Sequence, residues 1–463
     1  MQGSGSLPPE SSRVSQPFST NKFAPSIWYG FFWYGMNSRR TTNFSIQRLS
    51  SSNMNSREFA IEVVKTLQAA GYQALWAGGC VRDQLVGRTP KDYDVATNAT
   101  PDQVREVFGK KRTLAIGAAF GVITVLGPKT ASPIEVATFR RDSGYSDGRR
   151  PDSIEYTDAR EDAIRRDFTI NGMFYDPIND CVLDYVGGEK DLEAKQIRAI
   201  GNPHERIAED KLRMLRGIRF ACTFDFELEP LTLDAIQQHA KELRAVSNER
   251  IGTEVRKMLA SPNRTLAVKL LRESDLLGEI LPDEVTGESL YGDELQWEKI
   301  LSCLERLSPG DFETAATILL EPIVAKIGVM PIFMQWKLST DERKSIDWIC
   351  KHWKTLAQAD ELAWSIIQPL LLKTDVLGAL AVAESQSETP SSAVEFCRQR
   401  LAWPKERLNP TPLLDGKDLI ASGIDPGPKF KSVLNAVRAA QLDGEISQPD
   451  EAMAMAMRLI ESS

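Results

Sequence analysis

Two carboxylates lie two residues apart in the segment Lys91-Asp92-Tyr93-Asp94-Val95, a spacing that suits metal-assisted chemistry. The segment predicts a strand, on which Asp92 and Asp94 project to the same side while Tyr93 and Val95 face the core. Two like charges so close together are unfavourable unless a cation lies between them, and hard oxygen donors suit Mg²⁺. A solvated strand face gives the same spacing, so the pair alone leaves both interpretations open.

A third carboxylate could come from an adjacent strand. Glu135 lies within residues 133–139, an apolar and β-branched segment that also predicts a strand. Three carboxylates that converge from neighbouring strands can hold two metal ions, which stabilise the attacking and the leaving oxygen of an in-line displacement. Glu135 is therefore the candidate third acid, on its strand position only.

A glycine pair precedes these acids. Gly78 and Gly79 predict a turn between a short buried strand and a helix, and Arg82 and Asp83 fall on the first turn of that helix. Glycines let backbone amides approach a phosphate closely, and a helix N-terminus favours anions. No Gly-Lys-Ser or Gly-Lys-Thr sequence follows the glycines, so the turn is not a P-loop. The combined pattern is much more specific than any of its parts.

The bulk composition excludes several classes of protein. The 463 residues are enough for several domains, and their formal net charge of −8 means that any nucleic-acid site must be a local patch. The six cysteines form no Cys-x-x-Cys pair, which indicates free thiols in a reducing compartment. The three histidines leave little room for a histidine-based metal site. We expect a cytoplasmic protein with no membrane partner, and the composition indicates no oligomeric state.

Residues 1–53 differ from the rest of the chain. They are rich in Ser, Pro and Asn, contain a single acid, Glu10, and include an aromatic run at residues 27–34. That run is too short and too interrupted by glycine to span a bilayer. We predict a disordered extension or a mis-assigned start, because periodic sequence begins just after Met54. Organellar targeting by this segment is the alternative, since transit peptides are also poor in acids.

The periodicity after Met54 predicts an α/β segment followed by helices. Helices are expected over 57–67, 80–85 and 101–108, and strands over 74–77, 91–95, 120–126 and 133–139. Beyond His204 the pattern is almost entirely helical, over 207–223, 233–243, 248–259 and 264–272 and onward to the end. No internal repeat of fixed period is present.

The order of motifs resembles the class II tRNA nucleotidyltransferase and bacterial poly(A) polymerase family. The motifs that carry the resemblance extend from Gly78 to Glu254, and residues 285–410 add none. They are Gly78-Gly79 with Arg82-Asp83 and Asp92-x-Asp94, then Asp147-Gly148-Arg149-Arg150-Pro151, Arg165 to Asn171, Asp184 to Leu192, Glu209-Asp210-Lys211-Leu212-Arg213, and Glu249 to Glu254.

The resemblance implies an α+β fold. A nucleotidyltransferase head with a small mixed β-sheet and helices would precede all-α neck, body and tail domains. We predict boundaries at 54–175 for the catalytic head, 176–260 for the neck that recognises the base, 261–405 for the body, and 406–463 for a tRNA-binding tail.

The resemblance also implies the reaction and the residues that perform it. A nucleoside monophosphate would pass from CTP or ATP to the 3′ hydroxyl of tRNA, with the enzyme holding the 3′ end and acceptor arm. Asp92 and Asp94 would hold two Mg²⁺ ions, with Glu135 as the third catalytic carboxylate. The residues implied in nucleotide binding are Gly78, Gly79, Arg82, Arg166, Asn171, Asp210, Arg213, Arg216 and Arg219.

Asp210 and Arg213 are the predicted base-reading pair. Three residues apart on a predicted helix, they would be neighbours. Cytosine and adenine each present an amine donor beside a ring-nitrogen acceptor, which a carboxylate and a guanidinium complement. Guanine and uracil would leave both protein groups mispaired, at a cost of roughly 1–3 kcal/mol for each group. An exposed ion pair worth a few tenths of a kcal/mol is the alternative.

Several activities share these motifs. Residues 116–125 look more like tRNA nucleotidyltransferases than poly(A) polymerases, and the intact Asp147–Pro151 segment argues against an enzyme that adds only C. An enzyme that adds only A, alongside a separate CC-adding partner, would keep nearly every residue quoted. Poly(A) synthesis is a third possibility. A catalytically inactive RNA-binding protein is the non-enzyme alternative, against which the retention of Asp92 and Asp94 argues.

Overall fold

The computed structural model describes residues 54–144, 153–282, 293–308, 311–424, 427 and 429–461. The predictions for residues 1–53 and for the Asp147–Pro151 segment, with Arg149 and Arg150, lie outside the described residues.

A seven-stranded mixed sheet forms the N-terminal part, in the order β3-β4-β5-β2-β1-β8-β9. Strands β2 and β5 pair in parallel, whereas every other neighbouring pair in this sheet is antiparallel. The small mixed sheet predicted for the head is therefore confirmed. The strands are β1 Ala74–Ala77, β2 Asp94–Thr97, β3 Thr113–Leu114, β4 Val122–Val125, β5 Ile134–Thr138, β8 Phe174–Asp176 and β9 Cys181–Leu183.

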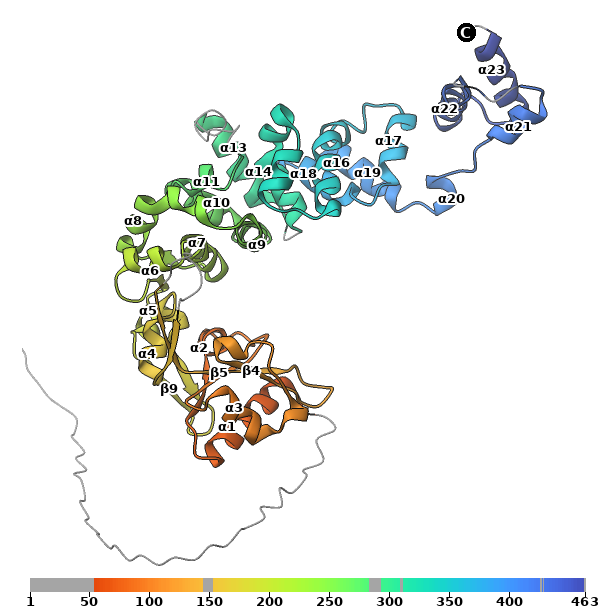
Figure 1. The fold of residues 1–463 in the computed structure, drawn as a ribbon. Coiled ribbons are helices and arrows are strands. Elements are labelled where there is room, and N and C mark those ends of the chain that lie inside the picture. Colours follow the sequence, from red (N-terminus) through yellow and green to blue (C-terminus); the bar gives the residue numbers. More distant parts are fainter. Residues whose placement is uncertain are drawn as a thin grey trace, which may run out of the picture. The chain divides into compact units, whose positions relative to one another are not determined.

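Helices α1 (Ser56–Ala69) and α3 (Pro101–Phe108) pack on one face of this sheet (Figure 1). Thr100 caps α3 in a capping box with Gln103, as the Thr-Pro sequence predicts. The opposite face is covered in part by α4 (Ala159–Ile164), which packs with Phe139 and Phe174. The face under α1 and α3 holds the larger core of this part. The part of the opposite face that α4 leaves uncovered is therefore available to ligands.

Helices make up nearly all of the chain from Pro203 onward (Figure 1). One apolar core runs from Phe168 to Cys397, and a separate cluster contains Leu414, Leu419 and Val433. The α+β class with all-α regions after the head is confirmed, while the predicted domain boundaries stay predictions. The helices are α5 Gly188–Glu193, α6 Pro203–Glu209, α7 Arg213–Phe224, α8 Pro230–His239, α9 Asn248–Leu259, α10 Arg264–Glu273, α11 Leu276–Glu279, α13 Glu294–Arg306, α14 Phe312–Ile327, α15 Met330–Gln335, α16 Thr340–Leu356, α17 Trp364–Leu371, α18 Val376–Ser385, α19 Ser392–Leu401, α20 Lys405–Leu408, α21 Gly416–Ala421, α22 Lys429–Leu442 and α23 Pro449–Glu461.

Within the described residues, no single helix is long and apolar enough to cross a membrane; the bent pair α17 and α18 meets the length and composition test only when taken together.

Two differences between the predicted elements and the structure affect the site. The strand expected over 91–95 begins only at Asp94, so Asp92 precedes it, although Tyr93 and Val95 are buried as expected. The helix expected over 207–223 is interrupted, because α6 ends at Glu209, Asp210 has extended backbone (φ −145°, ψ 105°), and α7 begins at Arg213. This interruption changes how Asp210 and Arg213 face each other.

Helix α9 packs directly against the chain at Trp336. A Cβ atom built on Gly252 would lie 2.0 Å from the Trp336 carbonyl oxygen, whereas one built on Gly278 would meet nothing within 4 Å. We predict that Gly252→Ala lowers the free energy of unfolding by about 1–3 kcal/mol, the usual cost of overpacking. The matched variant Gly278→Ala should change it by less than about 1 kcal/mol, with a gain in stability. Denaturant unfolding measures both, and equal stability of the two variants would contradict the close packing.

Candidate active site

The two carboxylates from neighbouring strands lie side by side. In the parallel pairing of β2 with β5, Asp94 is directly opposite Glu135. Loss of hydration, together with the negative charges of Glu135 and Asp92, raises the pKa of Asp94 to about 6 against the opposing effect of Arg166. The expected neighbouring strand for Glu135 is confirmed, and both Glu135 and Asp92 are near enough to Asp94 to repel its charge.

A cavity of about 450 Å³ lies next to Asp94. Arginines and aspartates dominate its lining, with the glycine turn on one side and the first residues of α7 on the other. Its lining residues are Gly78, Gly79, Arg82, Asp94, Arg140, Asp142, Arg165, Arg166, Asp167, Asn171, Asp210, Arg213, Arg216 and Phe220. Most of the predicted site residues thus share one cavity, while Asp92, Glu135 and Arg219 lie outside its lining.

The glycine turn needs glycine at its first position. Gly78 has φ +70°, and a Cβ atom there would lie 2.9 Å from the Arg166 guanidinium. Helix α2 (Gly79–Leu85) starts immediately after it and carries Arg82, whose guanidinium donates to the Asn171 side chain at 2.6 Å. Two residues predicted to bind nucleotide therefore contact each other. The Arg82 guanidinium also lies over the Phe220 ring, 5.2 Å from its centroid.

Buried aspartates hold the other arginines. Asp162, which is 1% exposed, accepts from Arg165 at 2.6 Å and from Arg166 at 2.9 Å. Asp142 extends this network by pairing with Arg165 at 3.3 Å and with Arg140 at 2.9 Å. Because each carboxylate is shared, the guanidiniums are held in place before any ligand arrives.

Asp167 and Arg216 form a further ion pair of the cavity wall. The Arg216 guanidinium donates to one Asp167 oxygen at 2.5 and 2.8 Å, and the other oxygen accepts from the Asn171 side chain at 3.0 Å and the Phe168 amide at 2.8 Å. Burial alone would raise the pKa of Asp167, but Arg216 and these hydrogen bonds lower it to about 2. The pair ties α7 to the head.

Comparisons with known proteins agree with this geometry. A model of the poly(A) polymerase head domain matches residues 74–198, and a model of the probable RNA and SrmB-binding site of polymerase A matches residues 225–284. The CCA-adding enzyme of Levilactobacillus brevis is 31% identical over 405 residues, covering 86% of this chain and 97% of that protein. The CCA-adding enzyme of Pediococcus pentosaceus is 33% identical over 431 residues, 87% of this chain and 98% of that protein.

The chain belongs to the CCA-adding enzyme family. Among solved structures, the Bacillus stearothermophilus CCA-adding enzyme in complex with CTP aligns with a TM-score of 0.69 at 28% identity, covering 87% of this chain and 96% of that chain. The family resemblance predicted from the motifs is thereby confirmed.

The predicted pair Asp210 and Arg213 is arranged differently from the expectation for one helix. Arg250 donates to one Asp210 oxygen at 2.7 Å, and the other oxygen accepts from the Leu212 amide at 3.1 Å. Arg213 instead pairs with Glu209 at 2.5 Å. Because the helix is interrupted between them, the prediction of adjacent positions on one helix is wrong, yet both side chains line the cavity of this family member.

Several residues that shape the site received no role from the sequence. Asp162 gave no signal before the fold was known, because its two arginine partners, Arg165 and Arg166, are ordinary near neighbours in the sequence. Asp167, Arg250 and Glu254 all lie within the family motifs named above. Their positions in those motifs could therefore have indicated a role in the site. Glu254, which is 3% exposed, pairs with Arg219. This contact places Arg219 behind the wall rather than in the lining.

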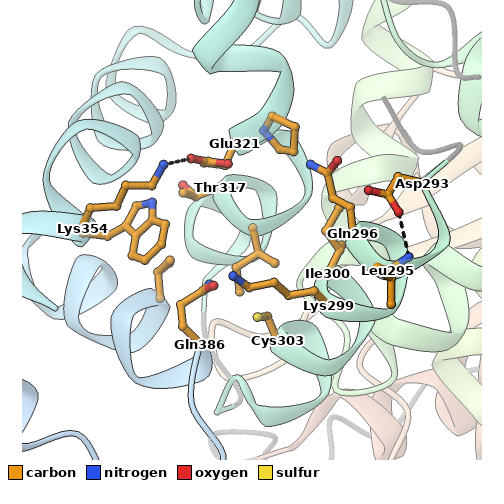
Figure 2. A pocket seen from close by; sticks show the side chains of 14 residues that line it. Asp293, Leu295, Gln296, Lys299, Ile300, Cys303, Thr317, Glu321, Lys354 and Gln386 are labelled. Carbon is orange, nitrogen blue, oxygen red and sulfur yellow. Dashed lines mark hydrogen bonds and ion pairs between the residues drawn. The ribbon is translucent and has the colours of Figure 1, made fainter. Parts of the chain in front are cut away.

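A second cavity, of about 470 Å³, lies within the helical body (Figure 2). Its lining comes from α13, α14, α16 and α18 and includes the ion pair of Lys354 with Glu321, at 2.6 Å. None of the predicted site residues of this family member reaches it. The smaller cavity beside Asp94 is therefore the candidate active site.

The Asp167 pair predicts a specific dependence of stability on pH. A carboxyl whose pKa is about 2 when folded and about 3.9 when unfolded adds about 2–3 kcal/mol at neutral pH. That contribution is complete above the unfolded pKa and is lost as pH falls through the folded pKa. We predict that Asp167→Asn is less stable than the wild type by this amount at pH 7, and that the difference roughly halves by pH 3. Urea unfolding at both pH values tests this, and an equal difference at both would count against it.

Proposed function

We propose that this protein adds CMP and AMP, taken from CTP and ATP, to the 3′ end of tRNA without a nucleic-acid template. The observation that carries the proposal is the single cavity that joins Asp94 and the glycine turn to Asp210 and Arg213. Relatives that the chain matches almost end to end are named CCA-adding enzymes, which agrees with it. The attacking 3′ oxygen would form a bond to the α-phosphorus while the bond to the β-phosphate oxygen breaks and pyrophosphate leaves. A cytoplasmic site for the reaction stays our prediction from the sequence.

The carboxylates suit a divalent cation by their chemistry. Among the described residues, no group of three or more His, Cys, Asp and Glu side chains is already arranged as a metal site. The repulsion that Glu135 and Asp92 exert on Asp94 is nevertheless the kind that a bound cation relieves. Asp92 and Asp94 would hold Mg²⁺, with Glu135 beside them. Bound Mg²⁺ would lower the pKa of the attacking hydroxyl and neutralise negative charge on the triphosphate.

The arginines would position the triphosphate. Arg82 and Arg166 meet at the glycine turn through Asn171, whose side chain bonds the first and whose backbone carbonyl lies 3.3 Å from the second. Guanidinium groups and backbone amides at this turn can bind phosphate oxygens, which the start of α2 also favours. Because carboxylates already fix these side chains, little reorganisation would accompany nucleotide binding.

Asp210 and Arg213 would read the base without pairing with each other. Asp210 uses two of its roughly four acceptor positions on Arg250 and Leu212, so it can still accept from an exocyclic amine. Arg213 donates to Glu209 and to the carbonyl oxygens of Arg206 and Arg165, which leaves guanidinium donors for a ring nitrogen.

The test of this function is nucleotide incorporation into tRNAs that end at the discriminator base, at C and at CC. Each receives CTP, ATP or both with Mg²⁺, and products are resolved at single-nucleotide length. Three residues added to the shortest tRNA, followed by a stop, are expected. Addition of a single A to the CC-ended tRNA only would mean an A-adding enzyme, and long A tails would mean poly(A) synthesis. Asp94→Asn should abolish every addition while tRNA binding persists; no addition by the wild type would refute the proposal.

Base choice gives a second prediction. Asp210→Ala removes the acceptor for the exocyclic amine, so incorporation of C and A should fall relative to U and G by about five- to hundredfold, the equivalent of roughly 1–3 kcal/mol. The control Asp234→Ala removes a carboxylate of α8 that accepts from Gln238 at 2.7 Å and lies on the surface. Competition assays with all four nucleotides provide the measurement. Unchanged exclusion of GTP and UTP by Asp210→Ala would show that another group reads the base.

A further inference from the structure

A row of residues in register connects the carboxylates to the edge of the sheet. Asp94 is opposite Glu135 across β2 and β5, Glu135 is opposite Thr124 of β4, and Thr124 is opposite Leu114 of the edge strand β3. Residues directly opposite each other share a face of the sheet, and neighbouring strands lie about 4.8 Å apart. Leu114 therefore lies on the face that carries the carboxylates, about 10 Å from the Glu135 strand position.

Exposed apolar side chains cluster along this edge. Leu114 is 42% exposed, Ile116 is 88% exposed and Phe120 is 46% exposed, and all three lie within seven residues of the chain. Tyr156, at 44% exposure, joins them, because its ring would lie 3.3 Å from a Cβ atom built on Gly121. We call these four side chains the edge strip. Large apolar groups gathered in this way mark a binding surface.

The edge strip continues from the active-site cavity. Arg140 lines the cavity, and its guanidinium donates to the Phe120 carbonyl oxygen. In the hairpin of β6 (Arg140–Ser143) and β7 (Ser153–Tyr156), Arg140 is directly opposite Tyr156. Glu135 lies outside the cavity lining and faces the side where the edge strip runs. A molecule on the strip would therefore reach the carboxylates from the Glu135 side of the row, next to the nucleotide cavity.

Cations at one end of the strip indicate what this molecule is. The exposed side chains of Lys110, Lys111 and Arg112 precede β3, and none has a carboxylate partner within the part of the chain that the structure describes. Exposed aromatic rings next to unpaired cations suit single-stranded nucleic acid, whose bases stack while its phosphates need neutralisation. On a chain with a formal net charge of −8, such a local basic group is the electrostatic signal expected for RNA.

We propose that the edge strip of Leu114, Ile116, Phe120 and Tyr156 receives the unpaired 3′-terminal bases of the tRNA acceptor strand. This inference rests on the proposed function and adds to it the surface that holds the second substrate. In-line transfer needs the attacking hydroxyl and the leaving pyrophosphate on opposite sides of the α-phosphorus. The cavity holds the nucleotide on the Asp94 side, and the edge strip holds the acceptor on the Glu135 side.

Steady-state kinetics with separate titration of tRNA and ATP tests the proposal. The double variant Ile116→Ser with Phe120→Leu removes apolar contact and the aromatic face, so KM for a CC-ended tRNA should rise about tenfold while KM for ATP stays within twofold. Phe120→Trp keeps a stacking surface and should stay near the wild-type KM for tRNA. Leu231→Ala removes another exposed apolar side chain, on α8 and 67% exposed, and should change neither constant.

Each other outcome overturns the inference in a recognisable way. Unchanged KM for tRNA in the double variant shows that the edge strip does not bind the acceptor, and so does an equal rise of both constants. An altered elution volume in gel filtration with unchanged kinetics would identify the strip as a protein interface. Matching melting temperatures of the variants and wild type exclude misfolding. Nucleotide addition by the wild type is measured first. A wild type that adds no nucleotide refutes the proposed function, whereas the variants test only the edge strip.

Discussion

Repulsion between like charges is the constraint on which the rest of this site depends. Six arginines line a cavity of about 450 Å³, and burial lowers the pKa of one of them, Arg82, as expected for a cation removed from water. Such a group of cations is stable only if carboxylates compensate it. Asp142, Asp162 and Asp167 do so from the wall, and a buried carboxylate that is shared between arginines also fixes their geometry.

The same constraint accounts for the ion pairs that join the head to the helices that follow it. The Asp167 carboxylate belongs to the head segment, and its arginine partner belongs to α7. On the neck side, α9 contributes Arg250 to Asp210 and Glu254 to Arg219. Asp210 and two arginines of α7 are therefore held by ion pairs from two other parts of the chain, the Asp167 segment and α9. Removing one partner of such a pair leaves an uncompensated buried charge, so the whole arrangement is cooperative.

The sequence was informative where local patterns determine structure. The capped start of α3, the bounds of α9 and the position of Glu135 on a strand next to Asp94 followed from caps, periodicity and strand position. The interruption at Asp210 did not follow, because the residues on both sides have helical periodicity and no glycine or proline separates them. One cause is tertiary, because Arg250 of α9 pairs with the Asp210 carboxylate. The other is local, because the same carboxylate accepts from the Leu212 amide two residues on, before α7 begins. The roles of the site residues stay predictions, since contacts alone do not establish function.

In the arrangement that we propose, the strand order of the sheet separates the two substrates. Strand β2 carries Asp94 and lies beside β1, which leads into the glycine turn, so the groups proposed to bind phosphate occupy one side of the carboxylates. Strands β5, β4 and β3 follow on the other side and end at an edge with exposed apolar side chains. Moving Glu135 by one residue in register would turn its carboxylate to the buried face and break the row. The register of β2 with β5 therefore sets both the distance between the acids and the side from which each substrate can approach.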